Sequence, residues 1–413
     1  MKKIYLDNAA TTPVRREVLD AMLPFFSEKY GNPSSFHSAG KEVKDAMEIA
    51  REKIAKILNC RSAEIIFTSG GTESDNLGIM GVARANRDKG RHTRPNFLTA
   101  EKNAAETQLK NLGGHIITST IEHPAVLEAC RKLEKEGFEI SYLPVDKEGI
   151  IKLDEFKKVL RQDTILISIM YANNEIGTIQ PIKEIAKILR DNTDKKNTGL
   201  PYFHTDGCQA AGALDFDVVK LGVDLLTFNG SKIYGPKGIG VLYVKKGIKL
   251  EPIIYGGGQE RGLRSGTENT AGIVGLAVAL ELAQKEKDEE NKRLTKLRDY
   301  LIEGILKNIK GSRLNGSKTN RLPNNINVYI PKVEGEAMLL YLDSKGIYAA
   351  TGSACSSMSL KPSHVLVAIG CQDEEAHSSL RFTLGRATKK EDLNYVLKVL
   401  PGIVKKLKEI SSL

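Results

Sequence analysis

The stretch EIIFTSGGTESDN (residues 64–76) decides the fold, because it joins an apolar strand to a helix through two glycines. The β-branched run 64–70 predicts a buried strand. The glycines let backbone N–H groups approach an anion, and Thr72 with Asp75 can cap the helix that begins there. Free N–H groups and a hydroxyl at a helix N-terminus are typical of a phosphate cradle, although an ordinary capped turn also explains these residues.

The same alternation of strand and helix continues along the chain. Helical patterns such as AVLEACRKLEKEG (125–137) lie between most of the apolar runs. This alternation predicts an α/β fold with a largely parallel sheet covered by helices on both faces. The last two strands are joined too tightly for a crossover helix, so one of them is expected to run antiparallel. The further strands are expected at 115–120, 139–145, 164–172, 201–207, 224–230 and 238–246.

The pattern of residue types along the sequence changes after about residue 250. A glycine-rich loop, YGGGQERGLRSGTEN (255–269), precedes a long charged helix over about 270–310. Two further strands (324–330 and 378–385) and a closing helix kinked at Pro401 predict a smaller α+β domain.

We therefore expect two domains. The large domain covers 16–255, and the small domain combines 1–15 with 256–413. The polar and basic segment 84–114 has no clear period, which is typical of an exposed excursion with partial helix. A partner-binding insert is the alternative interpretation of that segment.

The composition is that of a soluble globular chain. It has 413 residues, of which 41% are hydrophobic and 27% charged, without an apolar run long enough for a membrane helix or a signal peptide. A net charge of +10 is spread along the chain. A solvated basic surface explains it, and a patch for nucleic acid or an acidic partner is the alternative. The odd number of widely spaced cysteines argues against a zinc site or a disulfide framework and favours a reducing cytoplasm. The cysteines are at 60, 130, 208, 355 and 371.

Polar residues follow the ends of several predicted strands, where ligands bind in open α/β sheets. Taken singly, each has an ordinary explanation as a surface histidine, a helix-capping aspartate or a solvated lysine. Together they form the set that a pyridoxal phosphate (PLP) site requires. A lysine forms the Schiff base, a carboxylate holds the ring nitrogen, an imidazole covers the ring and a helix N-terminus takes the phosphate. The residues are His123, Asn173, Asn174, Asp206, Gln209 and Lys232.

Longer motifs, found in order over nearly the whole chain, resemble the cysteine desulfurases. These are class V, fold-type I PLP enzymes, in the branch that supplies sulfur for iron–sulfur cluster assembly and tRNA thiolation. The resemblance implies a fold-type I transferase with a mostly parallel seven-stranded sheet in the large domain. The motifs are YLDNAATTPV (5–14), YGNPSSFHSAG (30–40), FTSGGTESDNL (67–77), EHPAVL (122–127), ANNEIGT (172–178), KIYGPKGIG (232–240), GGGQERGLRSGTEN (256–269), GSACSS (352–357) and SHVL (363–366).

The resemblance implies a role for each matching residue. It makes Lys232 the Schiff-base lysine, His123 the ring-stacking acid–base residue, Asp206 the partner of the ring nitrogen and Gln209 a donor to the ring hydroxyl. Gly71 and Thr72 match the phosphate cradle. Asn174 lies beside cofactor and substrate, and Arg381 binds the substrate carboxylate. Thr267 reaches the phosphate of the other subunit in a homodimer, and Cys355 accepts the sulfur.

The resemblance also implies the reaction. L-cysteine joins PLP, Lys232 removes the Cα proton, and His123 shuttles a proton at the substrate thiol. The thiolate of Cys355 takes the sulfur, which leaves L-alanine and an enzyme persulfide. Small residues around Cys355, in a loop over about 350–362, suit a thiol that travels to an acceptor such as an iron–sulfur scaffold or a tRNA thiolation protein. Any cluster contact through Cys355 is expected to be transient.

The chain departs from the family pattern at several positions. Asn229 and Ser231 replace the usual phosphate ligands before the lysine, and both can still donate hydrogen bonds. Cys208 occupies a position often held by threonine. The segments 84–114 and 191–200 are longer than the family norm.

Three other functions share parts of this pattern. Another class V aminotransferase would keep Lys232 and Asp206 but has no need for a mobile cysteine. A selenocysteine lyase would differ mainly in the chalcogen. A scaffold without turnover would keep the fold and lack the visible chromophore of a lysine-bound cofactor.

Overall fold

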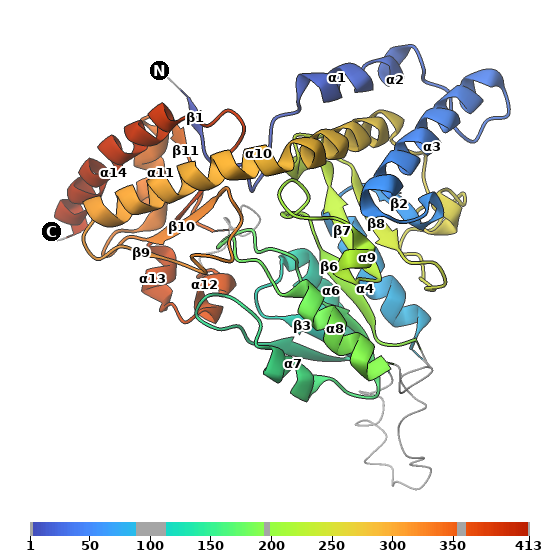
Figure 1. Cartoon of the computed structure of the whole chain (residues 1–413), viewed down its shortest axis with the longest axis horizontal. Coiled ribbons are helices and arrows are strands. Elements are labelled where there is room, and N and C mark those ends of the chain that lie inside the picture. Colours follow the sequence, from blue (N-terminus) through green and yellow to red (C-terminus); the bar gives the residue numbers. More distant parts are fainter. Residues whose placement is uncertain (1–2, 88–112, 194–198, 353–360, 412–413) are drawn as a thin grey trace, which may run out of the picture.

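The structure is a computed structural model that describes residues 3–87, 113–193, 199–352 and 361–411. Its centre is a seven-stranded sheet in the order β2-β8-β7-β6-β5-β3-β4 (Figure 1). Each predicted strand is present, shortened by one to four residues at one or both ends. The strands are β2 Ile65–Thr68, β3 His115–Ser119, β4 Glu139–Leu143, β5 Thr164–Ser168, β6 Tyr202–Asp206, β7 Leu225–Asn229 and β8 Gly240–Val244.

The direction of the strands agrees with the lengths of their connections. β3 pairs in parallel with β4 and β5, and β5, β6 and β7 continue the parallel arrangement. β8 is antiparallel to both β7 and β2, as the short β7–β8 connection predicts. The carboxyl ends of β3, β5, β6 and β7 therefore lie along one edge of the sheet.

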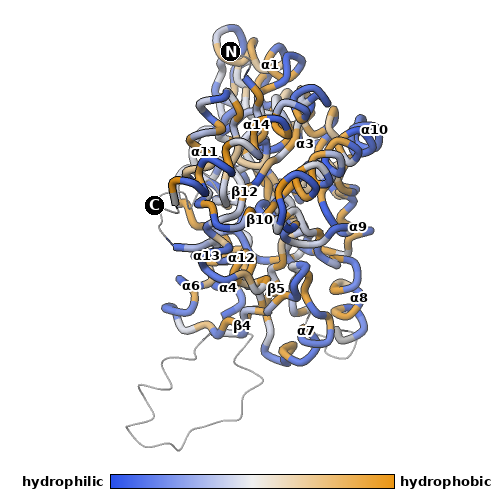
Figure 2. Tube along the Cα trace, turned by 90° about the vertical axis from the view of Figure 1, so that its left-hand side faces the viewer, coloured by the Kyte–Doolittle hydropathy of each residue, from blue (hydrophilic) through white to orange (hydrophobic). Residues whose placement is uncertain are grey.

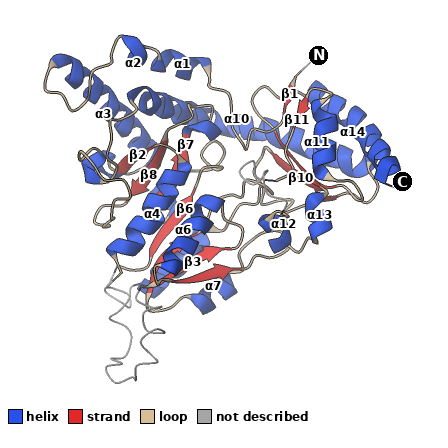
Figure 3. Ribbon diagram, turned by 180° about the vertical axis from the view of Figure 1, so that it is seen from behind, coloured by secondary structure: helices blue, strands red, loops and turns tan. Residues whose placement is uncertain are grey.

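Helices cover both faces of this sheet (Figure 3). On one face, α4 (Gly71–Ala85) and α6 (Pro124–Lys135) pack against apolar residues such as Ile66 and Ile116. On the other, α3 (Ser38–Leu58) and the start of α10 pack against alternate residues such as Phe67 and Ile117. The alternation along each strand explains why one sheet supports two apolar cores. The other helices near this sheet are α1 Arg16–Met22, α2 Pro24–Ser27, α7 Leu153–Val159, α8 Ile182–Thr193 and α9 Val218–Leu221.

A second core lies beside the first. It combines Ile4 and Leu6 with side chains from residue 294 onwards. Helix α10 (Thr270–Asn308) links the two cores, because its residues up to Leu280 pack on the large sheet and those from Leu294 pack in the second core (Figure 1). The predicted domain boundaries remain a prediction. The other elements here are β1 Ile4–Tyr5, β9 Arg313–Leu314, β10 Asn325–Tyr329, α11 Gly335–Asp343, β11 Ile347–Tyr348, α12 His364–Ala368, α13 Asp373–His377, β12 Ser379–Thr383 and α14 Lys390–Ser411.

Three sequence-based expectations fall largely on residues that the structure does not describe: the insert 84–114, the stretch 191–200 and the loop that carries Cys355. In the described part of the chain, the helices are too short or too polar to cross a membrane. Figure 2 shows hydrophobic and hydrophilic residues alternating along most of the helices, as expected for helices with one buried face.

A buried ion pair fastens the glycine-rich loop 255–269 to the large sheet. The Arg51 guanidinium lies 2.7 and 2.9 Å from the two carboxylate oxygens of Glu260, and only 6% and 2% of these side chains are exposed. The same carboxylate accepts the N–H of Phe67 in β2, at 2.9 Å. Glu260 therefore joins α3, β2 and the loop.

We expect Arg51→Ala to destabilise the protein by about 3–5 kcal/mol, because it leaves the Glu260 carboxylate buried without its cation. Urea unfolding at fixed protein concentration measures this. The matched control is Lys53→Ala, which breaks the exposed Lys53–Glu281 pair and should cost less than about 1 kcal/mol. Equal losses for the two variants would contradict the assignment.

Candidate functional site

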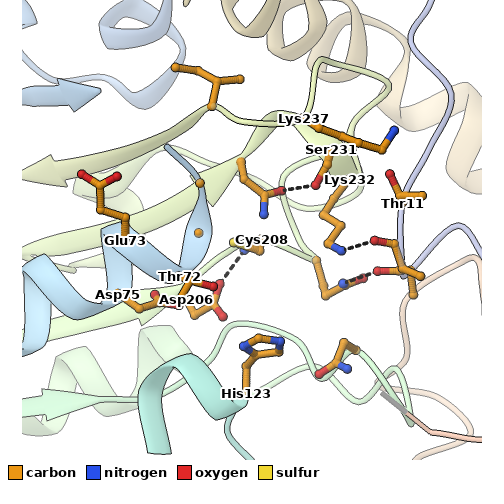
Figure 4. Close-up of a pocket in the computed structure, with 18 of the residues that line it drawn as sticks. Thr11, Thr72, Glu73, Asp75, His123, Asp206, Cys208, Ser231, Lys232 and Lys237 are labelled. Carbon is orange, nitrogen blue, oxygen red and sulfur yellow. Dashed lines mark hydrogen bonds between the residues drawn. The ribbon is translucent and has the colours of Figure 1, made fainter. Parts of the chain in front are cut away.

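A cavity of about 430 Å³ opens at the carboxyl edge of the large sheet (Figure 4). Most of the predicted site residues meet there, although they come from distant parts of the sequence. Thr267 lies on an exposed part of its loop, outside the described lining of this cavity, and Cys355 lies outside the described residues. The predicted residues in the lining are Gly71, Thr72, His123, Asn174, Asp206, Gln209, Asn229, Ser231, Lys232 and Arg381.

Lys232 reaches the cavity from a short turn, Gly230–Lys232, that directly follows β7. The turn needs glycine, since a Cβ on Gly230 would lie 2.5 Å from the Pro236 carbonyl oxygen. The Lys232 amine donates a hydrogen bond to the carbonyl of Ala10. The N-terminal segment thus packs against the lysine.

Asp206 is the last residue of β6, and its carboxylate accepts the N–H of Cys208 at 2.8 Å. His204 lies two residues earlier on the same face, between the hydroxyls of Ser168 (2.8 Å) and Thr227 (3.1 Å). Burial lowers the pKa of His204 to about 4, so this ring is neutral at neutral pH. Asp206 therefore has an uncharged imidazole as a neighbour on the same strand.

Asp75 was expected to cap α4 together with Thr72, and this expectation was wrong. The N-cap is Gly70, without a side-chain cap bond, and Asp75 lies buried further along the helix and lines the cavity. Burial and the nearby Asp206 carboxylate raise its pKa well above the usual value. Its Oδ1 atom has no hydrogen-bond partner among the described residues. Sequence alone did not separate a buried helix residue from a cap.

His123 forms the N-cap of α6, where its Nδ1 atom accepts the N–H of Ala125 at 3.1 Å. This bond fixes the ring and places the proton of the neutral form on Nε2. The imidazole points into the cavity below Asp206 (Figure 4). The ring is therefore oriented for proton exchange through Nε2.

The N-terminus of α4 and the turn after β7 form one end of the cavity. Gly71 must be glycine, because a Cβ there would lie 2.7 Å from the Cys208 sulfur and 3.1 Å from the Asn229 amide nitrogen. Unpaired N–H groups at the start of a helix attract anions. With the Thr72 and Ser231 hydroxyls, this end fits a phosphate, while Asp206 and Lys232 fit the ring and the aldehyde. These residues suit pyridoxal phosphate.

Arg381 lies in β12 and is almost completely buried. Its guanidinium donates to the Asp7 carboxylate at 2.8 Å and to the Asn174 carbonyl at 3.2 Å. Its Nε atom has no partner among the residues that the structure describes. A buried guanidinium with an available donor can bind the carboxylate of a small substrate.

Several residues in the lining were not predicted from the sequence. The segment from Ala9 to Thr11 was placed in the other domain, and its motif DNAATTP was the available signal. Lys237 and Glu73 also line the cavity, and both lie inside motifs quoted above. Among the described residues, histidine, cysteine, aspartate and glutamate form no group that could hold a metal ion.

Comparisons with known proteins show which family and fold this chain resembles. The model of the family "Aminotransferase class-V" matches residues 4–101 and 92–396. A cysteine desulfurase IscS of Dictyoglomus turgidum is 55% identical over 410 residues, which is 99% of this chain and 96% of that protein. The IscS of Methanosarcina thermophila is 53% identical, over 100% of this chain and 94% of that protein. A solved NifS-like protein superposes with a TM-score of 0.84 and 38% identity, over 98% of this chain and all of that one.

Glu122, next to His123, predicts a pH effect on stability. It is fully buried, accepts the Ser119 hydroxyl at 2.6 Å and the Met170 N–H at 3.0 Å, and burial raises its pKa to about 8. Between pH 4.5 and 8 the unfolded chain loses this proton while the folded protein keeps it. Stability should therefore fall as pH rises, by on the order of 1.4 kcal/mol per pH unit.

In Glu122→Gln this component should disappear, because the amide keeps an acceptor for Ser119 and cannot titrate. Urea unfolding across pH 4.5 to 8 measures the difference between variant and wild type. If the free energy of unfolding changes with pH in the same way for Glu122→Gln and wild type over this whole pH range, Glu122 is already ionised in the folded protein.

Proposed function

Since this chain belongs to the class-V aminotransferase family, and within it to the cysteine desulfurases, we propose that it removes sulfur from L-cysteine with the help of pyridoxal phosphate. The products are L-alanine and a persulfide on Cys355. The observation that carries the proposal is the meeting of Lys232, Asp206 and Arg381 in one cavity. These supply an amine, a carboxylate and a substrate-binding guanidinium.

The cofactor would be held at three points. The N-terminus of α4 with Thr72, Asn229 and Ser231 binds the phosphate, and Lys232 binds the aldehyde. Asp206 would hold the ring nitrogen. Gln209 would donate to the ring hydroxyl, although its side-chain amide also donates to the Ala9 carbonyl at 3.0 Å. The bound group supplies an electron sink that makes the Cα–H and C–S bonds of the substrate labile.

The substrate would be oriented by its carboxylate. Arg381 takes that carboxylate, in competition with its present partner Asp7, and Asn174 lies beside it. Lys232 removes the Cα proton. His123, fixed through Nδ1, exchanges a proton with the substrate thiol through Nε2.

Cys355 would accept the sulfur. An S–S bond forms between its thiolate and the substrate sulfur as the C–S bond breaks, and the carbon is protonated to give alanine, so no external oxidant is needed. The four described cysteines suit this role less well, since burial raises the pKa of each thiol: Cys60 to about 12, and also Cys130, Cys208 and Cys371. A high pKa disfavours the reactive thiolate.

The persulfide sulfur would pass to an iron–sulfur scaffold or a tRNA thiolation protein, with any cluster contact at Cys355 transient. The widely spaced cysteines support a location in a reducing cytoplasm. The proposed acceptors and the proposed location both rest on the sequence and the relatives together.

A homodimer is supported by the exposed apolar surface of residues 16–36, near the N-terminus. Large apolar side chains are exposed on and after α1 and α2, including Phe26 (62%), Tyr30 (78%) and Phe36 (107%). Thr267 is exposed and would complete the phosphate site of the partner subunit. Sedimentation equilibrium should give twice the chain mass of 45.4 kDa, and a monomer that keeps its cofactor would contradict the proposal.

Two variants test the chemistry. Cys355→Ser should keep the visible band of lysine-bound cofactor and respond spectrally to L-cysteine, yet release no sulfide in the presence of a reductant. Lys232→Ala should lose that band. Absorption spectra with sulfide and alanine assays measure both. Sulfide release from Cys355→Ser at the wild-type rate would remove Cys355 from the mechanism.

A further inference from the structure

Glu175 is a buried carboxylate with no role in the chemistry described above. It directly follows Asn174, at the edge of the cavity, and only 1% of it is exposed. Its Oε2 atom accepts a hydrogen bond from the hydroxyl of Ser363 at 2.6 Å. This bond joins the loop after β5 to a residue 188 positions later in the chain.

The same carboxylate lies against Gly352. A Cβ placed on Gly352 would be 3.3 Å from Glu175 Oε2 and 3.8 Å from the Cβ of Ser363. Gly352 and Ser363 flank the stretch that contains Cys355. Both ends of that stretch therefore meet at one carboxylate.

Glu175 is itself held firmly. Its N–H donates to the side chain of Asn173 at 2.8 Å. Its carbonyl accepts the side-chain amides of Asn325 and Asn327, each at 3.2 Å. These bonds come from both parts of the molecule, so the position of the carboxylate is fixed relative to the cavity.

Neighbouring contacts reinforce each end. Before Gly352, Ala350 exchanges two backbone hydrogen bonds with Arg381, at 2.6 and 3.1 Å. After Ser363, the His364 ring lies 2.9 Å from the carbonyl of Glu122, the residue that precedes His123. The two ends are thus connected to the proposed substrate-binding arginine and to the proposed acid–base histidine.

We infer that Glu175 is a positioning residue: its carboxylate accepts a hydrogen bond from Ser363 at one end of the Cys355 stretch and packs against Gly352 at the other, which keeps both ends beside the cavity and favours presentation of the thiol to the substrate sulfur. The inference rests on the proposed role of Cys355. Cys355 is three positions after Gly352 in the chain, so their Cα atoms lie at most about 11 Å apart. An anchor at Gly352 therefore limits the volume that the thiol searches and raises its effective concentration at the cavity.

Ser363 offers a matched pair of variants. Its hydroxyl also accepts the Leu366 N–H at 3.3 Å as the N-cap of α12. Ser363→Asn and Ser363→Asp both preserve a capping acceptor. Only asparagine can still donate to Glu175, whereas aspartate places a second negative charge against it.

The experiment uses the full-length protein with bound cofactor, mixed with L-cysteine under single-turnover conditions. Persulfide on Cys355 is quantified by mass spectrometry after quenching, and substrate binding is followed by the spectral change. We expect Ser363→Asp to slow persulfide formation roughly ten- to a hundredfold, with substrate binding unchanged, and Ser363→Asn to stay close to wild type. Amide exchange at 361–368 should rise in the aspartate variant only.

Wild-type persulfide formation in Ser363→Asp, or equal slowing in both Ser363 variants, would overturn the inference. If Ser363→Asp does not fold, Glu175→Ala and Glu175→Gln form the second pair, because glutamine still accepts the Ser363 hydroxyl. Equal rates in that pair would overturn it as well. The proposed function fails separately, if Cys355→Ser still releases sulfide.

Discussion

The parallel direction of β3, β5, β6 and β7 is the constraint on which the site depends. Parallel strands bring their carboxyl ends to one edge, so residues that follow different strands meet there without any local sequence relation. His123, Asn174, Asp206 and Lys232 are separated by up to 109 positions and still line one cavity. The antiparallel β8 lies between β7 and β2, so β2 runs in the same direction as β7 and its carboxyl end brings the start of α4 to the same edge.

Burial then determines which of these groups carry charge. His204 and Asp75 lie near Asp206, and the low polarity of the interior favours the neutral form of both. The same effect keeps the described thiols protonated. Among these neighbouring groups, Asp206 is therefore the one that would hold the ring nitrogen of the proposed cofactor.

The hydrophobic periodicity and the lengths of the connections were sufficient to predict the main elements of the architecture. The seven strands, the antiparallel β8 and helix α10 appear where the sequence predicts them, because apolar runs flanked by glycine and helical patterns have few alternatives in an α/β fold. The residues at strand ends were likewise found from the sequence. Contacts made across long separations were not, since no local pattern reports them. The contacts of Ala10 with Lys232 and of Asp7 with Arg381, and the proximity of Asp75 to Asp206, all belong to this class.

The proximity of Gly352 and Ser363 has a consequence for how such proteins vary. Because the two residues are neighbours in space, the chain between them begins and ends at the same place. The entropy of closing such a loop grows only slowly with its length, by about 0.6 kcal/mol for each doubling. Insertions or deletions between them can therefore lengthen or shorten the reach of the thiol while the rest of the fold stays unchanged. If Cys355 delivers the sulfur as proposed, changes in the length of this stretch would fit one enzyme to acceptors that bind at different distances from the cavity.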